Sequence, residues 1–186
     1  MSCPAIFLTL LLILPGCYKA NPDTKAQQTA SPQEIPADTL ITLERSECFG
    51  ACPAYKLSIS ADGRVVFEGK AFVKTKGRAE GRITLSQLSE LIRAFNNADY
   101  FSLKDSYAGE PPDGCPTMWT DNPAAITSIR SKGRSKKIYH YYGCRELGSG
   151  DALGKVWPQA LYELEEQIDQ IVGSDKWIAE VQNRKR

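Results

Sequence analysis

Segments with the residue patterns of strands, interrupted by two stretches of helical period, constrain the fold of this chain more than any other feature. The strand segments lie at residues 40–45, 55–59, 65–69, within 71–76, within 78–83, and at 124–131 and 136–142, and residues 55–59 show most clearly the period of two that is typical of a half-buried strand. The two helical stretches follow Thr84 and Pro158. The order of strands, helix, strands and helix predicts an α+β fold, with two principal helices packed on one face of a mainly antiparallel sheet.

Turn and cap residues indicate where these elements begin and end. Asp62-Gly63 predicts a two-residue type I′ turn between the strands on either side. Thr84 and Gln87 have the spacing of a helix capping box. Gly173 is placed to end the second helix. The apolar positions predict the core face of each helix; they are Leu85, Leu88, Leu91, Ile92 and Phe95 in the first, and Trp157, Leu161, Leu164, Ile168 and Ile171 in the second.

The N-terminal residues predict export. Residues 4–14 form an apolar run that is shorter than the approximately 20 residues of a membrane-spanning helix, as in a signal peptide. The sequence Leu14-Pro15-Gly16-Cys17 resembles a bacterial lipobox, although Pro15 is unusual in one. This resemblance implies a signal peptide at residues 1–16 and a diacylglycerol and palmitate-type acyl anchor on Cys17. An ordinary secretory signal or a short uncleaved anchor is the alternative.

Composition divides the remainder of the chain. Residues 17–37 are rich in Ala, Pro, Gln and Thr and predict a flexible tether, because they offer little apolar surface to bury. We expect a single α+β domain at residues 38–180 and a disordered tail at residues 181–186. The chain has 23 Lys and Arg against 22 Asp and Glu, a balance that gives no basis for nucleic-acid binding.

The chain has six cysteines. When Cys3 of the predicted signal peptide and Cys17 of the predicted anchor are set aside, four remain. An even number in an exported chain predicts disulfides. Of the three possible pairings we favour Cys48–Cys52 and Cys115–Cys144, because a turn around Gly50 brings Cys48 and Cys52 within disulfide distance. The second bridge would tie a long, turn-rich loop to the sheet.

Three other chemistries remain open. Cys48 and Cys52 could form a redox pair, although no helix follows them to lower a thiol pKa. Together with His140, the only histidine of the chain, they resemble the copper site of Sco-type copper chaperones, although the thioredoxin-like scaffold of those proteins is not predicted here. Paired carboxylates could serve glycoside hydrolysis; the candidates are Asp99, Asp105, Glu110, Asp113 and Asp121.

The motif Cys48-Phe49-Gly50-Ala51-Cys52-Pro53-Ala54-Tyr55 resembles the signature of a bacterial family known as domain of unknown function 6438. Further matching positions are Asp62-Gly63, Phe67-Glu68-Gly69, Gly77, Ile168-Asp169 and Trp177. The resemblance covers roughly residues 40–178 and implies a lipoprotein, but it implies no activity.

These observations together predict a cell-envelope lipoprotein that acts as a non-enzymatic binding or structural module. We expect a lipid anchor in the outer membrane, facing the periplasm. The residue after Cys17 is Tyr18, and an Asp at that position would resemble an inner-membrane retention signal. The expected partner is an envelope protein or ligand, with no cofactor and no nucleic acid. The alternative is a periplasmic copper-handling or thiol-redox protein that uses Cys48 and Cys52.

Overall fold

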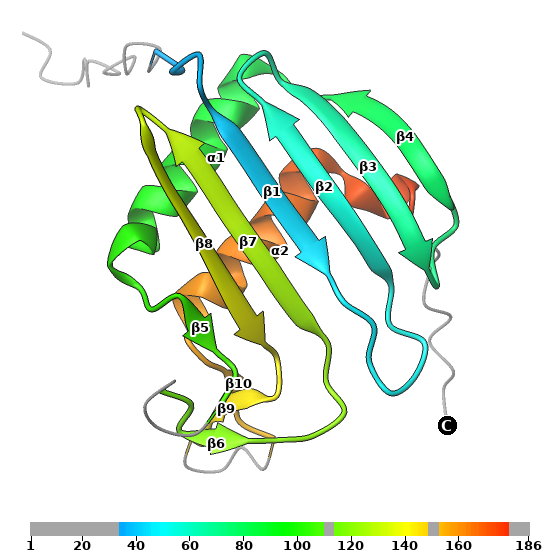
Figure 1. Cartoon of the computed structure of the whole chain (residues 1–186), viewed down its shortest axis with the longest axis vertical. Helices are drawn as coiled ribbons and strands as arrows, with labels where there is room; N and C mark the ends of the chain where they lie inside the picture. The colour runs from blue at the N-terminus through cyan, green and yellow to red at the C-terminus, as the bar shows by residue number, and fades with distance from the viewer. Residues whose placement is uncertain (1–33, 110–113, 149–152, 179–186) are drawn as a thin grey trace, which may run out of the picture. The chain divides into compact units, whose positions relative to one another are not determined.

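A seven-stranded sheet forms one layer of this computed structural model, which describes residues 34–109, 114–148 and 153–178 (Figure 1). The strand order is β4-β3-β2-β1-β7-β8-β5, and every neighbouring pair is antiparallel except β5 and β8. The strands are β1 (Leu40–Arg45), β2 (Ala54–Ser60), β3 (Arg64–Ala71), β4 (Gly77–Arg82), β5 (Ser106–Tyr107), β7 (Ala124–Ser131) and β8 (Arg134–Tyr141).

A second, smaller sheet has the order β10-β9-β6. Its strands are β6 (Thr117–Met118), β9 (Cys144–Glu146) and β10 (Lys155–Val156). This sheet gives local structure to the long loop that the sequence predicts between the first helix and β7.

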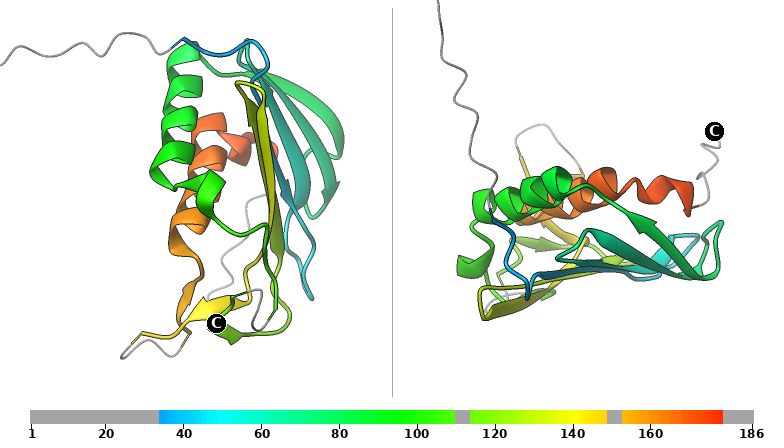
Figure 2. Two further views of the ribbon diagram at one scale, coloured as in Figure 1. Left: turned by 60° about the vertical axis from the view of Figure 1, so that its left-hand side comes forward. Right: turned by 90° about the horizontal axis from the view of Figure 1, so that it is seen from above.

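Two helices form the second layer. They are α1 (Leu85–Asn97) and α2 (Gln159–Val172), with the 3₁₀ helices η1 (Tyr100–Ser102) and η2 (Ser174–Lys176) after them. Figure 2 shows both α-helices on the same face of the large sheet. The predicted α+β class, with a mainly antiparallel sheet and two helices on one face, is therefore confirmed.

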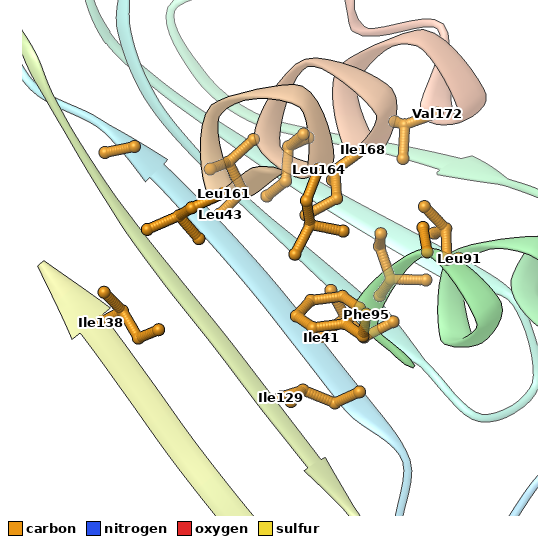
Figure 3. Packing of buried hydrophobic residues seen from close by; sticks show 14 of the residues in the cluster. Ile41, Leu43, Leu91, Phe95, Ile129, Ile138, Leu161, Leu164, Ile168 and Val172 are labelled. Atoms are coloured by element: carbon orange, nitrogen blue, oxygen red, sulfur yellow. The ribbon is translucent and has the colours of Figure 1, made fainter. Parts of the chain in front are cut away.

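The core lies between the two layers, where the inward positions of the strands meet the apolar stripes of the helices (Figure 3). Ile41 and Leu43 of β1 point inward, two residues apart, and Leu161, Leu164 and Ile168 of α2 face them. Each such side chain stabilises the fold by about 1.5–3 kcal/mol when it is fully buried.

The capping box at the start of α1 is confirmed. The Gln87 backbone N–H donates to the Thr84 hydroxyl at 3.2 Å, and the Thr84 backbone N–H donates to the Gln87 side chain at 2.9 Å. The predicted core face of α1 is wrong in one position, since Leu85 is 57% exposed. Leu85 is the first residue of α1, and the buried stripe of the helix begins at Leu88.

The prediction of a type I′ turn at Asp62-Gly63 is wrong. The Gly63 N–H donates to the Ser60 carbonyl at 2.9 Å, and only Gly63 of the pair has a positive φ, +78°. This is a type I turn followed by a left-handed glycine. A Cβ on Gly63 would lie 2.3 Å from the Ile83 carbonyl oxygen, so glycine is required. The type I′ turn occurs instead at Lys132-Gly133, where φ is +53° and +69°.

No separate strand forms within residues 71–76, contrary to the prediction. Ala71 ends β3, and Phe72 then takes a φ of +50°, which breaks the extended chain. Val73 enters the core, and the Thr75 N–H donates to the Trp177 carbonyl at 2.9 Å. The segment therefore pairs with the residues after α2 rather than with a strand.

The predicted signal peptide, Cys17 and the tail at residues 181–186 lie outside the described residues, as does most of the predicted tether. Ile35 packs against the core, so contact with the core starts before the expected domain boundary at Asp38. None of the helices in the described part of the chain is both long and apolar enough to span a membrane.

Candidate functional site

A cavity of about 730 Å³ opens where β1 leaves the sheet and the cysteine loop begins. Its walls come from this loop, from the start of β2, from the residue before β7 and from the C-terminal half of α2. The lining residues are Arg45, Cys52, Pro53, Tyr55, Pro123, Glu166, Asp169, Gln170, Gly173, Ser174, Asp175 and Ile178.

Arg45 organises the base of this cavity. It is the last residue of β1, and the alternation of the strand places it on the same inward face as Leu43. Its Nε and Nη2 donate to Asp169 Oδ2 at 3.2 and 2.8 Å, and Nη2 also donates to Glu166 Oε1 at 2.9 Å. Its Nη1 donates to the Tyr142 hydroxyl. The guanidinium is thus held on three sides by residues of α2 and the end of β8.

Arg45 and the Tyr55 hydroxyl beside it keep their protons. Burial alone lowers the pKa of Arg45, but its electrostatic interactions, with Tyr142 and Asp169 foremost, outweigh burial and raise that pKa well above its usual value. Burial and the Asp169 charge likewise raise the pKa of Tyr55. The Tyr55 hydroxyl therefore remains a donor, and it donates to Asp169 Oδ1 at 2.8 Å, beside the Ser174 hydroxyl at 2.6 Å.

A second, fully buried cluster adjoins the first through Tyr142. The carboxylate of Glu165 accepts from Thr127 Oγ1 at 2.8 Å and from the Tyr142 hydroxyl at 2.9 Å. Burial and the Glu165 charge raise the pKa of Tyr142, which keeps this hydroxyl a donor. His140 Nδ1 lies 2.8 Å from Glu165 Oε2, and His140 Nε2 lies 3.0 Å from the Trp157 carbonyl oxygen.

The geometry of His140 determines its protons. Nε2 faces a carbonyl, so it carries a hydrogen, and a second proton must lie between Nδ1 and the Glu165 carboxylate. The His140–Glu165 pair is electrically neutral wherever that proton resides. Both ring nitrogens are occupied and the side chain is fully buried, so His140 acts as a packing and hydrogen-bonding residue of the core.

The structure contains both disulfides that the sequence analysis favours. Cys48 and Cys52 are bonded with their Cα atoms 5.6 Å apart, and Cys115 and Cys144 with theirs 5.2 Å apart. The first bridge closes a short loop that leaves Phe49 89% exposed, and Cys52 lines the cavity. The second bridge is buried and joins the long loop to β9.

The residues of the copper hypothesis do not form an open site. Cys48 and Cys52 are bonded to each other, and His140 is held by Glu165 and a carbonyl oxygen. Within residues 34–109, 114–148 and 153–178, no group of three or more His, Cys, Asp and Glu could hold a metal ion.

The described acidic residues of the hydrolase hypothesis, Asp99, Asp105 and Asp121, do not line the cavity. Asp99 precedes η1, Asp105 lies 3.1 Å from Lys136 Nζ, and Asp121 is in the loop before β7. The other two, Glu110 and Asp113, lie outside the described residues.

Sequence reasoning missed the residues that build the site, namely Arg45, Glu165, Glu166 and Asp169. A signal for two of them was present. Arg45 continues the inward positions of Ile41 and Leu43, and Glu165 occupies the buried stripe of α2 between Leu161 and Ile168. Charged residues at positions whose period predicts burial indicate paired, buried charges.

No curated protein matches the chain. Residues 39–172 match a family described as "Domain of unknown function (DUF6438)". The matched span includes β1 with Arg45, the cysteine loop, both disulfides and both α-helices. Because the match covers well over half of the chain, this protein belongs to the family Domain of unknown function (DUF6438).

Proposed function

We propose that the protein is a lipid-anchored, non-enzymatic binding module of the cell envelope, which holds a ligand or partner in the cavity beside the Cys48–Cys52 loop. The anchor is Cys17, in the outer membrane and facing the periplasm. The observation that carries the proposal is the cavity itself. Its volume of about 730 Å³ lies within the range of about 300–1,000 Å³ typical of ligand sites.

The chemistry of the cavity favours binding over catalysis. Arg45, Tyr55 and Asp169 are engaged with one another, and the raised pKa values of Arg45 and Tyr55 keep both groups protonated through the physiological range. A general acid or base needs a pKa near the working pH. These side chains instead form a rigid, hydrogen-bonded floor that preserves the shape of the cavity.

Photo-crosslinking in cells tests the binding site. The photoreactive amino acid p-benzoylphenylalanine would replace Gln170, which is exposed and lines the cavity. The matched control is Gln159, on the same helix but away from the cavity. We expect a crosslinked product from position 170 and none from position 159. Equal products from both positions, or none from either, would contradict the proposed site.

Lipid labelling tests the anchor separately. Cells that produce the wild type should incorporate radiolabelled palmitate into the protein, and cells that produce Cys17→Ser should not. The Cys17→Ser protein should also leave the membrane fraction, because two or three acyl chains supply the attachment. A Cys17→Ser protein that stays in the membrane fraction would show that another segment anchors the chain.

A thiol-redox role is the second candidate, and one observation favours it: the Cys48–Cys52 bridge is only half-buried and Cys52 lines the cavity. Disulfide mapping of protein purified from an oxidising compartment without reductant separates the two roles. A bridge that resists mild reduction supports the binding module. A bridge that opens readily beside an intact Cys115–Cys144 bond supports exchange with a dithiol partner, because accessible disulfides are the labile ones.

A further inference from the structure

We infer that the cavity selects a positively charged, partly apolar ligand, namely an Arg or Lys side chain within a peptide segment of a partner. This inference rests on the proposed function and names the ligand class of the same site. It follows from the charges that line the cavity, from the pairing among them and from the apolar walls.

Among the described residues that line the cavity, the charges do not balance. One cation, Arg45, stands there against the carboxylates of Glu166, Asp169 and Asp175. Asp169 compensates Arg45 directly, since its Oδ2 accepts two of the guanidinium hydrogen bonds. The neighbouring His140–Glu165 pair is neutral and adds no charge. Glu166 and Asp175 therefore supply surplus negative charge at the cavity.

Glu166 is positioned to use this charge. Its Oε1 accepts from Arg45 Nη2 at 2.9 Å, which fixes the carboxylate, while the side chain remains 43% exposed. In the described part of the chain, Glu166 Oε2 accepts no hydrogen bond, and nor does the exposed carboxylate of Asp175. A ligand cation could therefore take a charge-assisted hydrogen bond without displacing an internal partner.

Lys176, the residue after Asp175, makes its contacts outside the cavity. Lys176 Nζ donates to the Val172 carbonyl at 3.2 Å and lies 4.0 Å from the centre of the Trp177 ring. Lys176 is not among the residues that line the cavity. An anionic ligand would consequently meet uncompensated negative charge.

The walls of the cavity are apolar around these carboxylates. The lining residues there include Pro53, Pro123, Ile178, Cys52 and Tyr55. Arg and Lys combine a charged head with an apolar stem, which matches a site of this kind. The volume is several times that of one side chain, so it also accommodates the residues that flank the basic one, and this favours a peptide over a small amine.

Three matched probe peptides test the charge selection. They are fluorescein-labelled Gly-Leu-X-Leu-amides in which X is Arg, Gln or Glu, and their binding to the full chain in detergent is measured by fluorescence anisotropy at low salt. We expect the Arg probe to bind about tenfold more tightly than the Gln probe, since two half-exposed carboxylates contribute modestly each. The Glu probe should bind most weakly.

A double variant tests the residues. Glu166→Gln with Asp175→Asn should remove the preference for Arg over Gln. The control is Glu90→Gln with Glu163→Gln, which changes the net charge equally at exposed helix positions outside the cavity. This control should keep the preference. A preference that survives the first double variant would overturn the inference.

Failure of this inference and failure of the proposed function give different results. Equal binding of the three probes, or no binding, together with position-specific crosslinking at Gln170, overturns charge selection and leaves the binding module standing. If crosslinking also fails, both are wrong.

Discussion

Glu165 joins distant parts of the protein through one buried carboxylate. It accepts hydrogen bonds from Thr127 of β7 and from Tyr142, and it shares a proton with His140 of β8. Through Tyr142 the cluster also reaches Arg45 at the base of the cavity. A single side chain of α2 thus pairs with three polar side chains of the sheet layer, Thr127, His140 and Tyr142.

Replacement of Glu165 by Leu should destabilise the protein by about 3–5 kcal/mol, because Thr127, His140 and Tyr142 then lose a buried acceptor. Glu165→Gln should cost less, since an amide can still accept from Thr127 and donate to a neutral His140. Urea denaturation followed by circular dichroism measures both changes.

The control is Glu163→Leu, two positions away on the exposed side of α2, which should change the free energy of unfolding by less than about 0.5 kcal/mol. If Glu165→Leu proves as stable as Glu165→Gln, the hydrogen bonds of this cluster do not support the fold.

At the scale of elements, α2 both packs against the core and lines the cavity, through side chains that lie close together along the helix. Leu161, Leu164 and Ile168 face the core, while Glu166 and Asp169 hold Arg45 and line the cavity. The cysteine loop forms the opposite wall through Cys52 and Pro53. The cavity therefore depends on the position of α2 relative to the end of β1.

The two disulfides should differ in their contribution to stability. The pair Cys115→Ala and Cys144→Ala should lower the free energy of unfolding by about 3.5 kcal/mol, and the pair Cys48→Ala and Cys52→Ala by about 2 kcal/mol, because the Cys115–Cys144 bridge closes the longer loop. The sequence separation is 29 residues for Cys115–Cys144 and 4 residues for Cys48–Cys52. Guanidinium denaturation of the two double variants measures the difference.

The shorter bridge should matter more for the cavity. Loss of Cys48–Cys52 should weaken crosslinking at Gln170, because Cys52 lines the cavity, whereas a folded variant without Cys115–Cys144 should retain the crosslink.

For the stability prediction, a larger loss of unfolding free energy without Cys48–Cys52 than without Cys115–Cys144 would contradict it. Such a result would show that strain or residual structure in the unfolded chain outweighs loop length.

For the molecule as a whole, exposed carboxylates that cap turns and pair with arginines set the stability in acid. The backbone N–H of Gly133 lowers the pKa of Asp38, although partial desolvation opposes it, and the N–H of Lys132 lowers it further. Hydrogen bonds lower the pKa of Asp62, first from Ser60, and that of Glu80, first from Arg64. In each case the folded protein favours the ionised carboxylate.

Stability should consequently be full at neutral pH and fall as the pH drops below about 4, through the lowered pKa values of these groups. The sign follows from proton uptake, since the unfolded chain binds protons at a higher pH than the folded protein does. Asp38→Asn should make the acid decline shallower, which urea denaturation between pH 2 and pH 6 measures. The gap between wild type and variant should narrow as the pH falls; a constant gap across this range would contradict the assignment.

Local signals predicted most of the large sheet and both helices. The strands β1 and β7 and the capping box of α1 occur where alternation and spacing place them. The errors occurred where a tertiary contact decides the local conformation. Gly63 turns as it does because Ile83 donates to its carbonyl oxygen at 2.9 Å, and Phe72 bends away so that Thr75 can pair with Trp177.

The sequence by itself determined the α+β class and favoured the two cysteine pairs. Periodicity and closure of the Cys48–Cys52 loop depend on residues close together along the chain, and Cys115 and Cys144 are the cysteines that then remain. Only the tertiary structure decided the cavity and its charges. Arg45 and Asp169 are 124 positions apart, and nothing local relates them. Their pairing follows from burial, since a charge at an inward position must find its counter-charge on whichever element packs against it.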